Sequence, residues 1–269
     1  METKLAILGV GNIGRAMAQG LAAVGTFRPE EILLTRRSSG TLDDLAERGF
    51  AVGADNRDAV RRADLIVAAV QPRQLDELLD DIAPALEQAR HVLVSVVSGA
   101  SIAAIVGRLG KDLPVVRAMP NTAIAVGSSM TCIAARPQDA HVLASARTLF
   151  DAVGRTMIID EAQIVPATAL CACGIAFFLR SVRAASQGGI EIGFHPEEAL
   201  TMAAQTALGA ASLLLANGRH PEREIDAVTT PRGCTIAGLN EMEHQGFSSA
   251  LIKGIVTSAV KAGALYETK

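Results

Sequence analysis

Three glycines near the start of the sequence have the spacing of a dinucleotide-binding loop. Gly9, Gly11 and Gly14 follow a short apolar segment at residues 4–8 and precede a stretch with helical periodicity. The first glycine permits a tight turn, the second lets a diphosphate approach the backbone, and the third lets the helix pack on the strand. The phosphates then lie at the positive end of the helix dipole. Because another strand-like segment follows at residues 31–34, the pattern predicts a dinucleotide site rather than an ordinary glycine-rich turn. Its predicted contacts are Gly9, Gly11, Asn12, Ile13 and Gly14.

The residues after the second strand-like segment indicate which dinucleotide is preferred. An acidic side chain at this place would bind the ribose 2'-hydroxyl, whereas cations would accept a 2'-phosphate. The sequence has Arg36, Arg37 and Ser38 here. Two guanidinium groups and a hydroxyl suit a phosphate, so NADPH is favoured and NADH is a second candidate. The alternative is that both arginines belong to a solvated surface turn.

A turn-forming segment in the last quarter of the sequence carries groups that could hold a small anion. Thr230, Pro231, Gly233 and Thr235 combine a sharp turn with the beginning of a helix. A carboxylate could dock on the first backbone N–H groups of that helix. A hydroxyl there is a sufficient partner for the nitrogen of a protonated imine, which needs no general base. The alternative is a threonine N-cap behind a tight turn.

Other candidate groups form no recognisable catalytic or metal-binding pattern. Dehydrogenases of hydroxy acids need a general base, often a lysine or a histidine. No lysine occurs between Lys111 and Lys253, which argues against that class. Cys171 and Cys173 are separated by one residue, a spacing that fits neither zinc nor redox motifs. We therefore expect no metal site and interpret both cysteines as packing residues.

The composition argues against several other classes of protein. The chain has 269 residues, a formal charge of -3 and 3% aromatic residues, so no nucleic-acid partner is expected. The sequence has 4 cysteines, too few for a disulfide scaffold, and no signal-peptide pattern, so we expect a cytoplasmic protein. Residues 199–218 carry no charge and are long enough to cross a bilayer. A polar stripe instead favours a helix buried in a soluble core or subunit interface, with no membrane association. The stripe consists of Thr201, Gln205, Gly209 and Ser212.

The elements that would position these residues change character along the chain. Short segments rich in Val, Ile and Leu alternate with helix-like stretches, which indicates a parallel sheet covered on both faces. These segments are residues 4–8, 31–34, 64–70, 91–97, 113–117 and 155–159. After residue 160 the strand patterns almost vanish and helical periodicity dominates. The predicted fold class is α/β, with an N-terminal Rossmann domain at residues 1–160 and an all-helical C-terminal domain at residues 161–269.

Several segments together resemble the pyrroline-5-carboxylate reductase family, over essentially the whole chain. The specific combination is Met-Pro-Asn-Thr at residues 119–122 followed by Pro-x-Gly-x-Thr at residues 231–235. The glycine loop, Asn56 and the sequence Ala-Val-Gln-Pro at residues 69–72 also match. Glycine loops alone would not separate this family from other NADP enzymes.

The resemblance implies an NAD(P)H-dependent oxidoreductase that reduces the C=N bond of 1-pyrroline-5-carboxylate to give L-proline, in proline biosynthesis. It implies that Thr235 is the catalytic residue, which hydrogen-bonds the ring nitrogen, and that the preceding turn holds the substrate carboxylate. The implied substrate contacts are Glu161, Thr230, Arg232, Gly233, Cys234 and Thr235. The implied cofactor contacts are Asn56, Ala69, Val70, Gln71, Pro72, Val97 and Ser98. The helical domains are expected to interlock into a homodimer or a larger homo-oligomer.

The sequence departs from the family pattern around the implied substrate site. The family commonly has Ser-Gly-Ser-Gly-Pro-Ala-Tyr where residues 171–177 are Cys-Ala-Cys-Gly-Ile-Ala-Phe. Gln71 stands in place of a lysine, and Arg232 in place of a glycine. We hypothesise that Arg232 adds a cation that tightens the binding of an acidic substrate. Two alternatives to the implied activity are a reductase of a related cyclic imino acid and a catalytically silent NADP-binding regulatory protein.

Overall fold

The computed structural model describes residues 4–37 and 39–266, and the chain divides into two compact units. Unit 1 comprises Met1–Cys173 and Thr257–Lys269, and unit 2 comprises Gly174–Val256. The sequence-based boundary at residue 160 differs from this division. The difference arises because Ile164 and Ala167 pack against strand residues of unit 1. The end of the last helix also belongs to unit 1.

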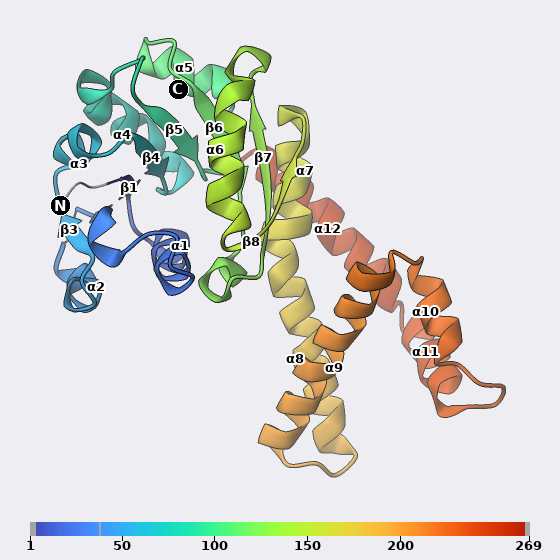
Figure 1. Cartoon of the computed structure of the whole chain (residues 1–269). Coiled ribbons are helices and arrows are strands. Elements are labelled where there is room, and N and C mark those ends of the chain that lie inside the picture. Colours follow the sequence, from blue (N-terminus) through green and yellow to red (C-terminus); the bar gives the residue numbers. More distant parts are fainter. Residues whose placement is uncertain (1–3, 38, 267–269) are drawn as a thin grey trace. The chain divides into compact units, whose positions relative to one another are not determined.

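Unit 1 is built on an eight-stranded sheet of order β3-β2-β1-β4-β5-β6-β7-β8 (Figure 1). Strands β1 to β6 pair in parallel, β7 runs antiparallel to β6, and β8 is parallel to β7. The chain crosses from one half of the sheet to the other between β3 and β4, so the strand order reverses between the neighbours β1 and β4. The strands are β1 (Leu5–Leu8), β2 (Ile32–Thr35), β3 (Ala51–Gly53), β4 (Leu65–Ala68), β5 (Val92–Ser95), β6 (Val115–Met119), β7 (Ser129–Ala135) and β8 (Gly154–Ile158).

Helices cover both faces of this sheet because side chains alternate along each strand. Leu5 and Ile7 of β1 join an apolar cluster with α1 and α6 on one face. Ala6 and Leu8 join a second cluster with α3, α4 and α5 on the other face. The helices are α1 (Asn12–Ala23), α2 (Asp43–Glu47), α3 (Asn56–Arg62), α4 (Leu75–Ile82), α5 (Ile102–Leu109), α6 (Ala140–Asp151) and α7 (Ile164–Ala167). The predicted Rossmann-like α/β architecture is confirmed.

Five elements of unit 1 have no counterpart in the sequence-based prediction: β3, β7, α2, α3 and α5. Strand β7 has the sequence Ser-Met-Thr-Cys-Ile-Ala-Ala, which contains few of the large β-branched or aromatic residues that mark a strand. It forms because β6 and β8 pair with its two edges. The sheet is parallel, as expected, except at β7, whose pairing with β6 is antiparallel.

Unit 2 consists of helices joined by short connections, as predicted. A π-helical turn at Thr168–Cys173 leads into α8 (Gly174–Glu191). Helices α8 and α9 (Pro196–Asn217) lie side by side (Figure 1), and a Cβ atom on Gly189 would be 3.0 Å from that of Ala199. The remaining helices are α10 (Pro221–Ala227), α11 (Cys234–His244) and α12 (Phe247–Gly263).

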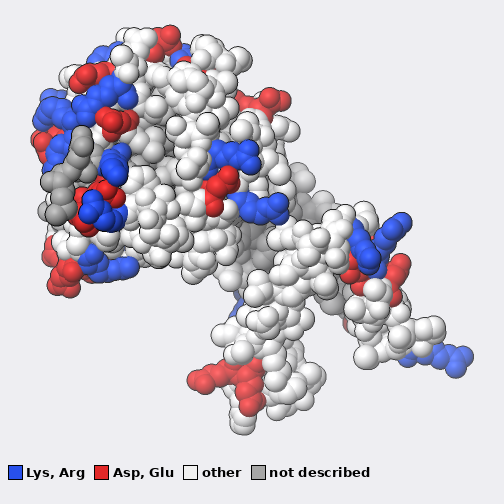
Figure 2. Space-filling model, viewed as in Figure 1, with Lys and Arg blue, Asp and Glu red and all other residues white. Residues whose placement is uncertain are grey.

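Few side chains of unit 2 are buried within the chain. Only Gly174, Ser186 and Ala199 are buried among residues 174–256, all of which the structure describes. Figure 2 shows a mostly uncharged surface over α8 and α9. The helical stretches Glu161–Glu191 and Pro196–Asn217 are long and apolar enough to cross a membrane by length and composition alone. Their exposure leaves a large apolar surface that some partner must cover.

Candidate active site

A cavity of about 580 Å³ lies at the carboxyl ends of β1, β2 and β4. This is the point where the strand order reverses, which is the usual ligand site of an open α/β sheet. The cavity brings together the predicted cofactor residues Gly9, Gly11, Arg36, Arg37, Asn56, Ala69, Val70 and Gln71. Its other lining residues, which the sequence reasoning missed, are Val10, Ala54, Arg73, Gln74, Glu77, Leu78 and Asp81.

Several predicted cofactor residues do not line this cavity. They are Asn12, Ile13, Gly14, Pro72, Val97 and Ser98. Ser38 lies outside the described residues. Glu77 and Asp81 are four positions apart on α4, which directly follows the predicted contacts at residues 69–72. That helical spacing, so close to predicted contacts, is the signal that could have identified the missed cavity wall.

The glycine loop has the geometry that its sequence predicts. Gly9 has a φ of 81°, and a Cβ atom on it would lie 2.1 Å from Cγ1 of Val70. Gly11 caps α1 without a side-chain hydrogen bond, and a Cβ atom there would meet nothing within 4 Å. A diphosphate could therefore approach the amides of Gly11 and the first turn of α1. A Cβ atom on Gly14 would lie 3.3 Å from Cγ2 of Ile7, so this glycine brings α1 close to β1.

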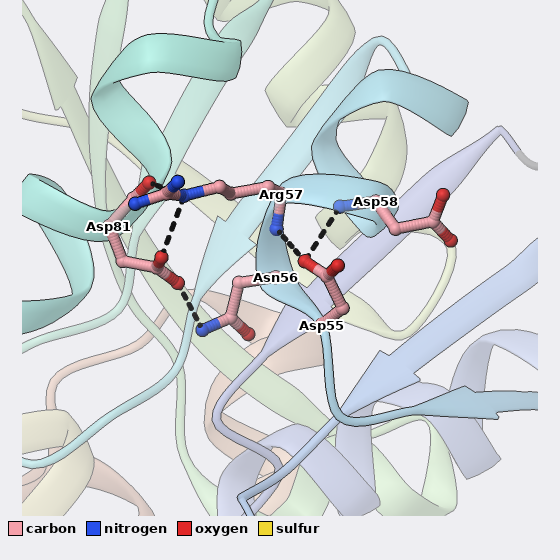
Figure 3. A network of polar contacts seen from close by, with 5 residues as sticks. All are labelled: Asp55, Asn56, Arg57, Asp58 and Asp81. Carbon is pink, nitrogen blue, oxygen red and sulfur yellow. Dashed lines mark hydrogen bonds and ion pairs between the residues drawn. The ribbon is translucent and has the colours of Figure 1, made fainter.

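Asn56 is fixed in the cavity wall by a network that joins β2, α3 and α4, and Figure 3 shows the part between α3 and α4. Its Oδ1 accepts a hydrogen bond from Oγ1 of Thr35 at 2.7 Å, and its Nδ2 donates to Oδ2 of Asp81 at 3.1 Å. Arg57 Nε donates to Oδ1 of Asp81 at 2.9 Å, so the charge of that carboxylate is compensated. Asp55 caps α3 by accepting from the backbone N–H groups of Arg57 and Asp58 at 2.8 and 3.0 Å. These amides, with that of Asp58 foremost, hold the pKa of Asp55 below its usual value.

Both cations and acids line the cavity. Arg37 forms an ion pair with Glu77, and both side chains are 68% exposed. Arg36 and Arg73 also line the cavity. Because an exposed ion pair contributes little free energy, an incoming phosphate dianion can compete with Glu77 for Arg37. The wall therefore offers guanidinium groups to an anionic ligand.

Glu161, an implied substrate contact, is engaged within unit 1. Its Oε1 accepts a hydrogen bond from the Ile102 backbone N–H at 2.6 Å and from Nη1 of Arg117 at 3.2 Å. The Arg117 side chain is 5% exposed. Burial lowers the pKa of Arg117, and the hydrogen bond from Arg117 to Glu161 opposes that shift. Glu161 thus ties β6 to the start of α5, and its contact with substrate stays a prediction.

The remaining predicted substrate residues form one turn within unit 2. Gly233 N donates to Thr230 O at 2.9 Å across Pro231 and Arg232. Arg232 has a φ of 60° and is the only residue other than glycine with a positive φ among residues 4–37 and 39–266. A Cβ atom on Gly233 would lie 2.4 Å from Oγ1 of Thr230. Thr235 is half-buried in the first turn of α11.

The first amides of α11 are available to an anion. Gly233 caps this helix, and a glycine has no side chain that could accept a hydrogen bond from the first turn. A helix beginning has unpaired N–H groups and a positive dipole end, which together favour a carboxylate. The turn thus combines anion-binding amides with the hydroxyl of Thr235.

The thiol of Cys171, which the sequence reasoning treated as a packing group, interacts with the thiol of Cys132. Cys132 on β7 is buried, and Cys171 in the π-helical turn is half-buried against the same apolar cluster. A hydrogen bond from the Cys132 thiol lowers the pKa of Cys171 to about 7. Nδ2 of Asn121 donates to the Cys171 carbonyl oxygen at 3.2 Å. The segment that departs from the family pattern therefore contacts the Met-Pro-Asn-Thr motif.

Comparisons with known proteins cover both parts of the chain. The family NADP oxidoreductase coenzyme F420-dependent matches residues 4–99, and the family Pyrroline-5-carboxylate reductase dimerisation matches residues 161–265. Pyrroline-5-carboxylate reductase 1 of Dictyostelium discoideum is 54% identical over 100% of this chain, which spans 51% of that relative. Pyrroline-5-carboxylate reductase 2 of the same organism is 45% identical over 96% of this chain and 91% of the relative. In fold, the chain is similar to the Plasmodium falciparum pyrroline carboxylate reductase crystal structure with NADP bound, with a TM-score of 0.88 and 23% identity over 98% of both chains.

The Rossmann sheet, the glycine-lined cavity at its reversal point and the match to an NADP oxidoreductase family over residues 4–99 place the chain among the nicotinamide-dinucleotide-binding proteins. Within that class, the chain belongs to the pyrroline-5-carboxylate reductase family, because its identity to a relative reaches 45% over nearly the full length of both sequences. The match to the dimerisation family over residues 161–265 supports a homo-oligomer.

Proposed function

We propose that the protein reduces 1-pyrroline-5-carboxylate to L-proline with a hydride from NADPH. The observation that carries this proposal is the glycine-lined cavity in a chain that belongs to the family and keeps its Pro-x-Gly-x-Thr pattern at residues 231–235. The chain spans about half the length of the first relative and nine-tenths of the second, so the activity of those whole proteins is proposed here.

The dinucleotide would be held by groups of the cavity. The open space at Gly11 and the first amides of α1 suit the diphosphate, and Thr35 and Asp81 hold Asn56 in the cavity wall. The guanidinium groups of Arg36 and Arg37 suit a 2'-phosphate, which favours NADPH over NADH. When bound, this cofactor supplies the hydride that adds to the carbon of the C=N bond.

The substrate would be held by the turn before α11. Its carboxylate accepts hydrogen bonds from the free amides of that helix, and the Thr235 hydroxyl hydrogen-bonds the ring nitrogen. A protonated imine is a strong electrophile, and its nitrogen keeps the proton when the carbon receives the hydride. No side chain therefore needs to act as a general base.

The test is substrate-dependent oxidation of NADPH by the purified protein with a panel of cyclic imines of different ring size and carboxylate position. We expect turnover with 1-pyrroline-5-carboxylate and formation of L-proline. Equilibrium titration with NADPH and NADH, repeated with Arg36→Ala, measures the cofactor preference. NADPH binding without turnover of any imine would refute the proposal and support a silent NADP-binding protein.

A related cyclic imino acid is the second candidate substrate. The observation that favours it is the replacement of the family hydroxyls at positions 171 and 173 by cysteines, at a π-helical turn. Such turns are often found at functional sites. A higher kcat/KM for a six-membered or 2-carboxylate analogue would favour this second candidate.

Homodimerisation or higher assembly through the C-terminal helices is the third part of the proposal. The exposed apolar side chains of α8 and α9, such as Phe178, Leu179 and Leu208, need a cover, and the polar stripe of α9 suits a protein interface better than lipid. We propose a soluble cytoplasmic homo-oligomer. Light scattering after size-exclusion chromatography, with fractionation of soluble and membrane material, tests this assignment.

A further inference from the structure

Tyr266 connects the end of the described chain to the helix that forms one wall of the cofactor cavity. Its hydroxyl donates to Oδ1 of Asp76 at 2.7 Å, across 190 positions of sequence. The ring packs against the apolar cluster formed by α3, α4 and α5. Asp76 lies in the first turn of α4, next to Glu77 and Leu78, which line the cavity.

The same residue lies directly on the loop that follows β5. Gly99 has a φ of 89°, and a Cβ atom on it would be 2.9 Å from both Cβ and N of Tyr266. Only a glycine permits this backbone conformation together with so close a contact. Gly99 precedes Ser101, which caps α5, and follows Val97 and Ser98, two predicted cofactor contacts that lie outside the lining of the cavity.

Asp76 links these contacts to a wider ion-pair network. Arg108 on α5 lies 4.0 Å from Asp76 and also pairs with Asp80 on α4. Burial, followed by the hydrogen bond to Asp76, raises the pKa of Tyr266 to about 12, so its hydroxyl stays a donor at neutral pH. One side chain thus contacts α4 and the β5–α5 loop, while Asp76 joins it to α5.

We propose that Tyr266 is a positioning residue for the dinucleotide, fixing the first turn of α4 and residues 97–99 against each other. The inference rests on the proposed function, because it takes the cavity as the NADPH site. Its physical basis is preorganisation: a wall that is already ordered costs less entropy when the ligand binds. The residue acts through its neighbours, and no direct contact with the ligand is required.

Tyr266→Phe removes only the hydroxyl, Tyr266→Ala removes the ring, and Leu265→Ala changes the exposed neighbour as a matched control. Fluorescence titration gives the Kd of NADPH for each protein at a temperature where all are folded, as judged from Tm and oligomeric state. We expect the Kd to rise about threefold in Tyr266→Phe and about tenfold in Tyr266→Ala, since a hydrogen bond to a carboxylate and ring packing are lost. Leu265→Ala should bind as the parent does.

Steady-state kinetics and a double-mutant cycle separate positioning from mere stability. The KM of NADPH should follow the Kd, while kcat at saturating NADPH stays within about twofold, because the bound state is restored by excess ligand. In an Asp76→Ala background, Tyr266→Phe should cause no further rise in Kd.

An unchanged Kd in Tyr266→Ala, whatever happens to its Tm, would overturn the proposed role. If the parent protein binds NADPH but reduces no imine, only the proposed function falls, and the Kd values still decide the role of Tyr266. If the parent protein does not bind NADPH, both proposals fall.

Discussion

Replacing Arg232 by glycine should make the protein more stable and its substrate binding weaker. Arg232 follows Pro231 in a turn closed by the hydrogen bond from Gly233 N to Thr230 O, and its φ is 60°. Positive φ at the third position of a turn that has proline at the second is typical of type II, where glycine is preferred. The backbone at this position therefore suits glycine, which is the residue of the family pattern. This chain has an arginine there instead.

The magnitude follows from the backbone terms. An L-residue in the left-handed region costs about 1–2 kcal/mol. Glycine loses more conformational entropy on folding than other residues do, which offsets about 0.5–1 kcal/mol of the stabilisation. From the midpoints of these two ranges, the net gain for Arg232→Gly is about 0.75 kcal/mol, which corresponds to a rise in Tm of about 1.5–3 °C for a chain of this size. The comparison must use equal protomer concentrations, because assembly shifts Tm.

The effect on activity comes from the lost cation. An exposed charge pair contributes about 0.2–1 kcal/mol, so the KM of a carboxylate substrate should rise by a factor of about 1.4 to 5 while kcat stays the same. Added salt should reduce the difference in KM between the parent protein and Arg232→Gly, because it screens the charge of Arg232. Arg232→Lys is the control, since it keeps both the charge and the positive φ. A Tm that does not rise would refute the strain argument, and an unchanged KM would refute the role of the cation.

Three further predictions test individual groups. Thr235→Ala should lower kcat/KM about tenfold or more through loss of one catalytic hydrogen bond, and parent-like kinetics would exclude that role. Gly11→Ala should keep the parent Tm but lose NADPH affinity, because its Cβ atom meets no protein atom within 4 Å yet projects where a diphosphate would approach. Gly9→Ala should instead lower the free energy of unfolding by about 2 kcal/mol or more, and with it the Tm, because its Cβ atom would overlap Val70 at a positive φ. Equal Tm values and equal NADPH affinities of the two variants would contradict the geometry. Alkylation of Cys171 in a Cys173→Ser, Cys234→Ser background should have a midpoint near its pKa of about 7, since the thiolate reacts and the Cys132 thiol stabilises it. In Cys132→Ala the midpoint should rise towards about 8.5, and an unshifted midpoint would contradict the pairing.

The sequence was sufficient for the features that depend on local pattern. The glycine loop, the first two strands and α1 follow from spacing and periodicity, and the helices after residue 160 follow from the loss of strand patterns. Strand β7 could not be predicted in this way, because its small residues have little preference for a strand and its pairing partners decide its conformation.

The parts of the site that escaped prediction depend on contacts between distant residues. The contact of Tyr266 with Asp76 and Gly99 joins positions far apart in the chain, and no local pattern indicates it. The positive φ of Arg232 was equally invisible, since the sequence suggests a turn but not that a non-glycine residue occupies its left-handed position. Glu77 and Asp81 could have been predicted from the sequence, because their helical spacing beside predicted contacts indicates the cavity wall.

The scarcity of buried side chains in unit 2 has a consequence for how this protein is made. A group of helices that buries only Gly174, Ser186 and Ala199 has almost no core with which to offset the entropy lost on folding. Newly synthesised chains would then fold this part only when they associate with one another. Dilution of the protein would therefore lower the fraction of chains in which unit 2 is folded. Expression level, rather than temperature alone, would set the fraction of chains that reach the native state.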